Sequence, residues 1–160
     1  SGAIAIGYNV SSTAGKHGPA FGAAYGASKA GLVSMGQSLR AELRGRGVSA
    51  SVVCPGFTHD GGIYERMKQV LGKGTPPQMG STSAEAVAKA VVKAIRRDRG
   101  ELLVNWPPMR PVFALAALWP SLGAWIIRES SVRFLKKIAK GRGSRVEGRG
   151  SDKQPTKHVA

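Results

Sequence analysis

Cysteine is nearly missing from this sequence, since Cys54 is the only one among 160 residues. A single thiol excludes an internal disulfide framework and a cysteine-rich zinc site, and it is compatible with a reducing compartment. Acidic side chains are also scarce, with 9 Asp and Glu against 24 Lys and Arg, so the formal net charge is +15. A charge of this size favours phosphate-bearing partners or an anionic membrane surface, but it does not determine the fold.

A hydrophobic run long enough to cross a membrane is absent as well. A span takes about 20 apolar residues, whereas the longest run here, residues 112–127, is interrupted by Pro120 and Gly123. This run favours a buried or subunit-facing helix pair, with a membrane-lying segment as the alternative. Residues 1–10 have neither the basic segment nor the long apolar core of a secretory signal. We therefore expect a cytoplasmic protein, with peripheral membrane attachment as the alternative.

Apolar segments alternate with helical patterns along the first two thirds of the chain. Strands are predicted over residues 2–11, 48–54 and 101–105. Helices are predicted over residues 23–44 and from about residue 82 onward. On the first helix, apolar residues recur mostly three or four apart, which predicts one buried face; they are Ala24, Ala27, Leu32, Met35, Leu39 and Leu43. The second helix opens on a capping-box pattern formed by Thr82 and Glu85.

This alternation predicts an α/β fold with a Rossmann-like, doubly wound parallel sheet. Three strands are few for such a sheet, and the first strand has an edge without an obvious partner. The sequence therefore looks like the C-terminal half of a doubly wound domain, with three strands and flanking helices. We expect this half to occupy residues 1–110. A helical extension, apolar and then basic, is expected over residues 111–140, and a disordered basic tail over residues 141–160, where almost no apolar residues occur.

Three polar residues carry the strongest indication of chemistry. Ser12 stands at the end of the first predicted strand, and ligands of open α/β sheets bind outside such ends. Tyr25 and Lys29 follow in a Y-x-x-x-K pattern, a spacing that places both side chains on one helical face. A tyrosine in water has a pKa of about 10, and a nearby ammonium favours its ionised form. We predict that Lys29 tunes Tyr25 as a general acid/base.

A second set of residues shows the same spacing. Tyr64 and Lys68 are four apart, and Ser51 precedes Tyr64 by the same interval that separates Ser12 from Tyr25. Ser51, however, lies inside the second predicted strand, whereas Ser12 lies at a strand end. The pattern favours the Ser12 set, and it favours an apolar lid residue for Tyr64.

The segments NVSSTAGKHGPAFGAAYGASKAGL and VSASVVCPGF together resemble the C-terminal half of a short-chain dehydrogenase/reductase. The resemblance implies an NAD(P)-dependent oxidoreductase that moves hydride between nicotinamide and a carbonyl or alcohol carbon. It implies that Ser12 polarises the substrate carbonyl, that Tyr25 exchanges a proton with the substrate oxygen, and that Lys29 also binds the nicotinamide ribose. It also implies that Tyr25, like Lys29, contacts the cofactor. The segment that lies against the nicotinamide carboxamide corresponds to Pro55, Gly56 and Thr58.

The family's N-terminal dinucleotide-binding half has no counterpart in this sequence. The glycine-rich turn and the residue that selects NAD or NADP are both absent. We therefore expect either a fragment of a longer dehydrogenase or a truncated product with little activity of its own, and the choice between NAD and NADP stays open. When complete, such an enzyme is expected to be a homo-oligomer, without a metal and without a specific nucleic-acid partner.

The substrate is expected to be bulky and apolar, such as a lipid-like or steroid-like carbonyl or alcohol. The apolar residues that occupy the place of the family's substrate lid are Phe57, Ile63, Tyr64, Met67 and Leu71. A function of another class is also compatible with the sequence. Residues 128–140 can form a basic amphipathic helix, which is typical of proteins that bind membrane surfaces or polyanions.

Overall fold

The computed structural model describes residues 5–60, 64, 68–69, 79–126, 128–129, 132 and 136. The expected disordered tail, residues 141–160, lies outside this part of the chain, as does most of the predicted amphipathic segment 128–140. Among the described helices, none is both long and apolar enough to span a bilayer.

Three parallel strands form the central sheet in the order β1-β2-β5. They are β1 (Ala5–Val10), β2 (Val48–Pro55) and β5 (Glu101–Val104). Val10 lies beside Val53, and Pro55 lies beside Val104, so the three strands end near one another. Every residue of the central strand after Val48 is buried, as expected for its small and β-branched side chains.

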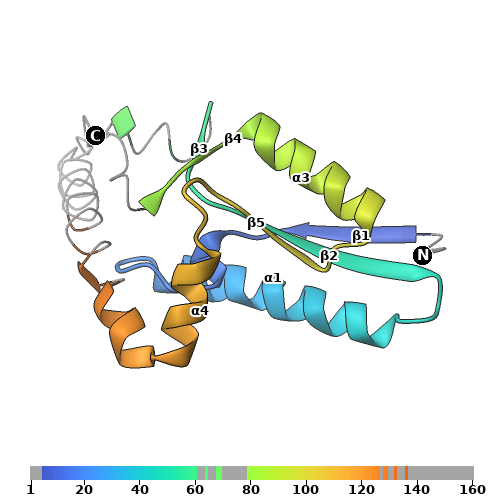
Figure 1. Ribbon diagram of the computed structural model, residues 1–160, viewed down its shortest axis with the longest axis horizontal. Helices are drawn as coiled ribbons and strands as arrows, with labels where there is room; N and C mark the ends of the chain where they lie inside the picture. Colours follow the sequence, from blue (N-terminus) through green and yellow to red (C-terminus); the bar gives the residue numbers. More distant parts are fainter. Residues whose placement is uncertain are drawn as a thin grey trace, which may run out of the picture.

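Helices cover the sheet on both faces. Figure 1 shows α1 (Ala23–Glu42) on one side of the sheet and α3 (Ala84–Arg97) on the other. Each helix connects two parallel neighbours, α1 between β1 and β2 and α3 between β2 and β5. This arrangement confirms the predicted α/β fold with parallel strands and flanking helices, of which the chain holds a part.

Helix α1 buries a different face from the one that its apolar residues predict. Its buried residues are Gly26, Val33 and Gly36, whereas Met35 and Leu39 are exposed. The reason is the short distance between helix and sheet, because a Cβ at Gly36 would lie 2.2 Å from Cγ2 of Val52. Small residues therefore face the strands, and the larger side chains point away from them.

Helix α3 begins one residue later than its capping pattern predicts. The N-cap is Ser83, whose hydroxyl accepts a hydrogen bond from the Ala86 N–H at 3.1 Å. Thr82 belongs instead to β4 (Thr82–Ser83), which pairs with β3 (Thr58–His59) in a small parallel sheet. Strands of two residues carry no periodic signal, so the sequence did not indicate them.

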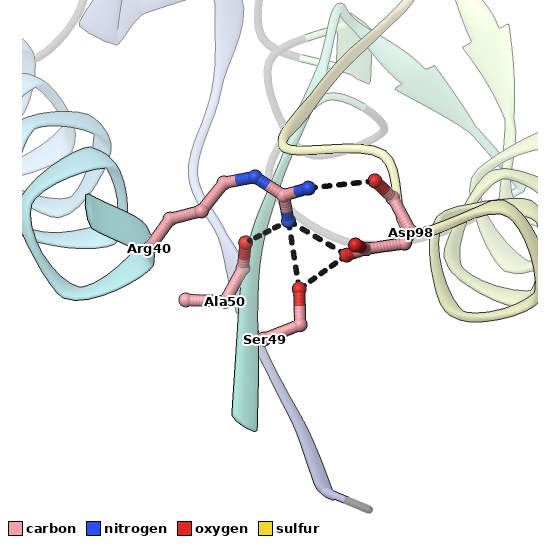
Figure 2. A network of polar contacts seen from close by, with 4 residues as sticks. All are labelled: Arg40, Ser49, Ala50 and Asp98. Carbon is pink, nitrogen blue, oxygen red and sulfur yellow. Dashed lines mark hydrogen bonds and ion pairs between the residues drawn. The ribbon is translucent and has the colours of Figure 1, made fainter. Parts of the chain in front are cut away.

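A polar network joins both helices to the amino-terminal part of β2, at the edge of the sheet opposite the carboxyl ends of the strands (Figure 2). One guanidinium nitrogen of Arg40 donates to Ser49 Oγ at 2.7 Å, to the Ala50 carbonyl oxygen at 3.0 Å and to the Asp98 carboxylate at 2.8 Å. The other nitrogen donates to the Asp98 carbonyl oxygen at 2.8 Å. Ser49 also donates its hydroxyl to the Asp98 carboxylate. Since Asp98 is the C-cap of α3, the network fixes the end of α3 to α1.

The Asp98→Asn substitution is expected to lower the urea midpoint of unfolding at neutral pH. Hydrogen bonds from Arg40 and then from Ser49 favour the carboxylate, and they hold the pKa of Asp98 below its ordinary value. The stabilisation is therefore fully present above the pKa of about 3.9 for an unfolded aspartate, and it is lost as the pH falls through the lower folded value. Unfolding curves of both proteins should converge in acid, and a gap that stays constant with pH would contradict this role.

The chain continues past β5 into two helical segments that contact each other. Helix α4 (Arg110–Leu118) is followed by a helical segment over residues 120–126. The contact is close, because a Cβ at Gly123 would lie 2.4 Å from Cβ of Ala116. The predicted helix pair is present, but its larger apolar side chains are not buried in the described structure. Leu118 and Trp119 are among the most exposed apolar residues.

Candidate active site at the carboxyl edge of the sheet

Ser12 lies at the carboxyl edge, two residues after β1 ends. It is the N-cap of η1 (Thr13–Gly15), a single turn of 3-10 helix. Its Oγ accepts a hydrogen bond from the Ala14 N–H at 3.2 Å and donates to the Pro55 carbonyl oxygen at 3.5 Å. The hydroxyl therefore links the end of β1 to the end of β2, at the edge where open α/β sheets bind ligands.

Tyr25 and Lys29 project from the first two turns of α1. The Lys29 Nζ donates to the Val10 carbonyl oxygen at 3.4 Å and lies 5.8 Å from the centroid of the Tyr25 ring. Tyr25 is 45% exposed, so its ring is accessible from outside. An ammonium has three N–H donors, and the hydrogen bond to Val10 occupies one of them in the described structure. Two donors stay available to a ligand.

Close backbone contacts hold the beginning of α1 against η1. The buried Ser11 donates its hydroxyl to the main-chain carbonyl oxygen of Lys29 at 2.7 Å. A Cβ at Gly15 would lie 2.6 Å from the same oxygen, so a side chain does not fit there without a shift of α1. The Ser11 hydroxyl and the Gly15 backbone together fix the position of the Lys29 main chain relative to η1. From this position the Lys29 ammonium reaches the Val10 carbonyl oxygen.

The turn after β2 is tied to the turn after β5. The Gly56 N–H donates to the Val104 carbonyl oxygen at 3.0 Å, and the Thr58 hydroxyl donates to the Gly56 carbonyl oxygen at 3.4 Å. Asn105 Nδ2 donates to the Met79 carbonyl oxygen at 3.4 Å. A Cβ at Gly56 would lie 2.0 Å from Asn105 Oδ1, so the amide fills the space behind the turn. Sequence reasoning missed Asn105, because one asparagine after a strand forms no motif.

Aromatic rings gather beside this turn. The ring centroids of Phe57 and Tyr64 are 5.6 Å apart, and those of His59 and Tyr64 are 6.2 Å apart. Tyr64 is buried. Of the residues predicted to line the substrate site, the structure thus brings Phe57 and Tyr64 together. Ile63, Met67 and Leu71 lie outside the described residues.

The second Y-x-x-x-K set has a different environment from the first. Ser51 is completely buried in the middle of β2, and its hydroxyl has no hydrogen-bond partner in the described structure. Tyr64 is buried, whereas Lys68 is exposed. Ser51 therefore cannot reach a ligand at the surface, whereas Ser12 lies at the end of a strand and Tyr25 is accessible.

Two other titratable side chains, Cys54 and His17, are packed against neighbouring residues. Cys54 is fully buried, and this burial, ahead of the nearby Glu101 carboxylate, raises the pKa of its thiol to about 11. The His17 ring stacks on Phe113 with centroids 5.5 Å apart, and partial burial lowers the pKa of His17. Within the described residues, no group of three His, Cys, Asp or Glu side chains is placed to hold a metal ion.

Comparisons with known proteins show which family this sequence is similar to. Residues 2–69 match the family described as short chain dehydrogenase. The ketoacyl reductase HetN of Nostoc is 42% identical over 101 residues, which cover 63% of this chain and 34% of that protein. An uncharacterized oxidoreductase of Mycobacterium tuberculosis is 36% identical over 112 residues, which cover 69% of this chain and 41% of that protein. The chain thus spans well under half of each relative.

A solved structure has a similar arrangement over part of its length. The actinorhodin polyketide ketoreductase, crystallised with NADPH, aligns with 63% of this chain and 45% of its own, with a TM-score of 0.47 and 23% sequence identity. The family match contains Ser12, Tyr25 and Lys29, together with the turn after β2. The family match and the two relatives place this chain in the short-chain dehydrogenase/reductase family, of whose fold it carries a part.

Proposed function

We propose that this chain forms the catalytic edge of a short-chain oxidoreductase that moves hydride between a nicotinamide cofactor and a carbonyl or alcohol substrate. One observation carries the proposal. The Lys29 ammonium is held at the end of β1 by the Val10 carbonyl and lies beside the accessible Tyr25 ring. Ser12 occupies the same edge through its hydrogen bond to Pro55.

In this proposal Tyr25 transfers a proton to or from the substrate oxygen. Ser12 donates a hydrogen bond to that oxygen, an interaction that strengthens as negative charge develops there. Because the Ser12 hydroxyl meets the Pro55 carbonyl at 3.5 Å, the long end of the hydrogen-bond range, it can exchange this partner for a ligand at little cost. Lys29 supplies positive charge beside Tyr25, which stabilises negative charge as it develops during proton transfer.

The same edge fits NAD or NADP. Lys29 has donors available for ribose hydroxyls, and the turn at Pro55 and Gly56 is braced by Asn105, with Thr58 bonded to its backbone. When bound, a nicotinamide dinucleotide supplies or accepts the hydride. We propose no preference between the two cofactors, because the residues that the structure describes at this edge do not distinguish a 2′-hydroxyl from a 2′-phosphate.

The proposed substrate is a bulky apolar ketone or alcohol. Phe57, which is half-buried and packs against the buried Tyr64, supplies apolar surface in the turn after β2. The names of two relatives support this substrate class. One is the ketoacyl reductase described above, and the other is the 1-deoxy-11-beta-hydroxypentalenate dehydrogenase of Streptomyces exfoliatus, which is 42% identical to this chain over 83 residues.

An absorbance assay of reduced nicotinamide tests the proposal. The protein that contains this sequence in full should be incubated with NADH or NADPH and a panel of β-ketoacyl thioesters and polycyclic ketones. We expect oxidation of at least one cofactor that depends on the substrate. If neither cofactor is consumed with any ketone, and neither is reduced with the matching alcohols, the proposed activity is wrong.

A second candidate is a protein that binds anionic membranes or other polyanions through its basic C-terminal segment. Residues 128–160 carry 10 basic and 3 acidic side chains, which supports this role. Each cation near an anionic bilayer contributes about 1 kcal/mol of binding. Liposome flotation with and without residues 128–160 discriminates this candidate from the first, because hydride transfer does not depend on it. Unchanged flotation after truncation would exclude the basic segment as the contact.

A further inference from the structure

A surface of exposed apolar side chains forms where α4 turns into the next helix. We name this surface the apolar corner. It consists of Leu115, Leu118, Trp119, Leu122 and Trp125. Leu118 is 72% exposed, Trp119 59% and Trp125 58%. Single exposed apolar residues are common on the surfaces of soluble proteins. Five large ones within eleven positions are unusual, and such a patch typically marks an interaction site.

The two helical segments that carry the apolar corner are held in place by contacts that do not involve the corner residues. The buried residues Ala116 and Gly123 bring α4 and the following helical segment together. Three residues before Ala116, and so on the same face of α4, Phe113 stacks on His17, in the loop that follows Ser12. The leucines and tryptophans therefore point away from the contacts that fix the helices.

Charge favours an anionic lipid surface as the partner. The cations Arg110, Arg128 and Lys136 are exposed on either side of the apolar corner in the sequence, and the whole chain carries +15. A second copy of the chain would bring this excess of like charge together, which disfavours association. Anionic headgroups would neutralise it. Tryptophan is also suited to the boundary between headgroups and acyl chains, because it combines an apolar ring with one polar N–H.

We propose that the apolar corner inserts into the surface of an anionic bilayer, and that the cations around it contact the lipid headgroups. In this proposal the corner lies in the plane of the membrane surface, as interfacial amphipathic segments do. The proposal extends the second candidate above by naming its apolar contact. It also joins the carboxyl edge to the membrane, because α4 follows β5 directly and touches the loop after Ser12 (Figure 1).

Flotation with vesicles of phosphatidylglycerol and phosphatidylcholine tests this proposal in the full chain. The Leu118→Gln, Trp119→Gln double variant is expected to partition at least about tenfold more weakly than wild type, because two large apolar side chains no longer insert. The matched control is Val92→Gln with Ile95→Gln, which removes two exposed apolar residues from α3. This control should float as wild type does. Vesicles of phosphatidylcholine alone should bind the wild type weakly.

A second measurement reports insertion directly. In a Trp106→Phe background the two remaining tryptophans lie in the apolar corner. Their emission should shift to shorter wavelength with anionic vesicles and should be quenched by brominated lipids. Wild type that does not float, or a corner variant that floats as wild type does, would overturn the proposal. So would a chain that dimerises without vesicles through the corner and fails to bind them.

In the second of these outcomes the basic segment could still bind membranes, since truncation of residues 128–160 tests it separately. Failure of the apolar corner would also leave the proposed oxidoreductase activity untouched, because that activity is measured in solution with nicotinamide cofactors. The three ideas are therefore distinguished by three separate measurements.

Discussion

Substitution of Tyr25 by Phe in the complete enzyme is expected to lower kcat by about 10²–10⁴-fold, the usual contribution of a general acid/base. The change removes one hydroxyl and keeps the ring over which the Lys29 ammonium sits. Folding should be nearly unaffected, because the Tyr25 side chain is 45% exposed. Turnover of reduced nicotinamide and urea unfolding together separate loss of chemistry from loss of structure.

Tyr8 provides a matched control for this prediction. The Tyr8→Phe substitution removes a hydroxyl from an exposed ring on β1. We expect this variant to retain kcat within about tenfold, because Tyr8 has no part in the proposed catalytic or substrate site. Comparable turnover in the Tyr25→Phe and Tyr8→Phe proteins would shift the assignment away from Tyr25.

The strands were predictable because their signal is local. Residues 48–54 are small and β-branched and end at Pro55-Gly56, and the observed strand β2 covers them with one residue more. The alternation of strands and helices then fixed the parallel fold, which needs no information about side-chain contacts. The carboxyl edge followed from the same alternation, so the sequence could predict Ser12 at a strand end and Tyr25 and Lys29 on one face of the next helix.

The packing of α1 was not predictable from its apolar periodicity. That periodicity selects Met35 and Leu39, which are exposed, and it passes over Gly36, which is buried. Hydrophobicity does not register a glycine that permits close approach. The role of Asn105 was not predictable for a related reason. Asn105 packs against Gly56, which is far away in the sequence and adjacent in space. Contacts between distant glycines and side chains leave no local pattern.

Replacement of Gly36 by Ala is expected to destabilise the protein by about 3 kcal/mol, at the upper end of the usual cost of overpacking. The added Cβ would lie 2.2 Å from Cγ2 of Val52, which is completely buried in the central strand. Neither the helix nor the strand can yield without moving the other. Because Gly36 is seven residues beyond Lys29 on the same helix, a displaced α1 would also move the Lys29 ammonium from Val10.

Gly31 supplies the matched control on the same helix. A Cβ there would meet nothing within 4 Å, so Gly31→Ala should stabilise α1 by roughly 0.5–1 kcal/mol through helix propensity alone. The opposite signs expected at two glycines five residues apart isolate the contact with the sheet from the propensity of the helix. Chemical denaturation of the two single variants measures both effects.

The pair Gly36→Ala and Val52→Ala tests the contact itself. Val52→Ala alone leaves a cavity and should cost stability, as other losses of buried methyl groups do. In the double variant the Cγ2 atom is gone, and the nearest remaining Val52 atom, its Cβ, lies at an ordinary 3.7 Å from the new methyl group. The double variant should therefore be more stable than the sum of the two losses predicts, by about 1–3 kcal/mol of coupling. Additive losses would mean that α1 is held at this distance by other contacts, such as the hydrogen bond from Ser11 to Lys29.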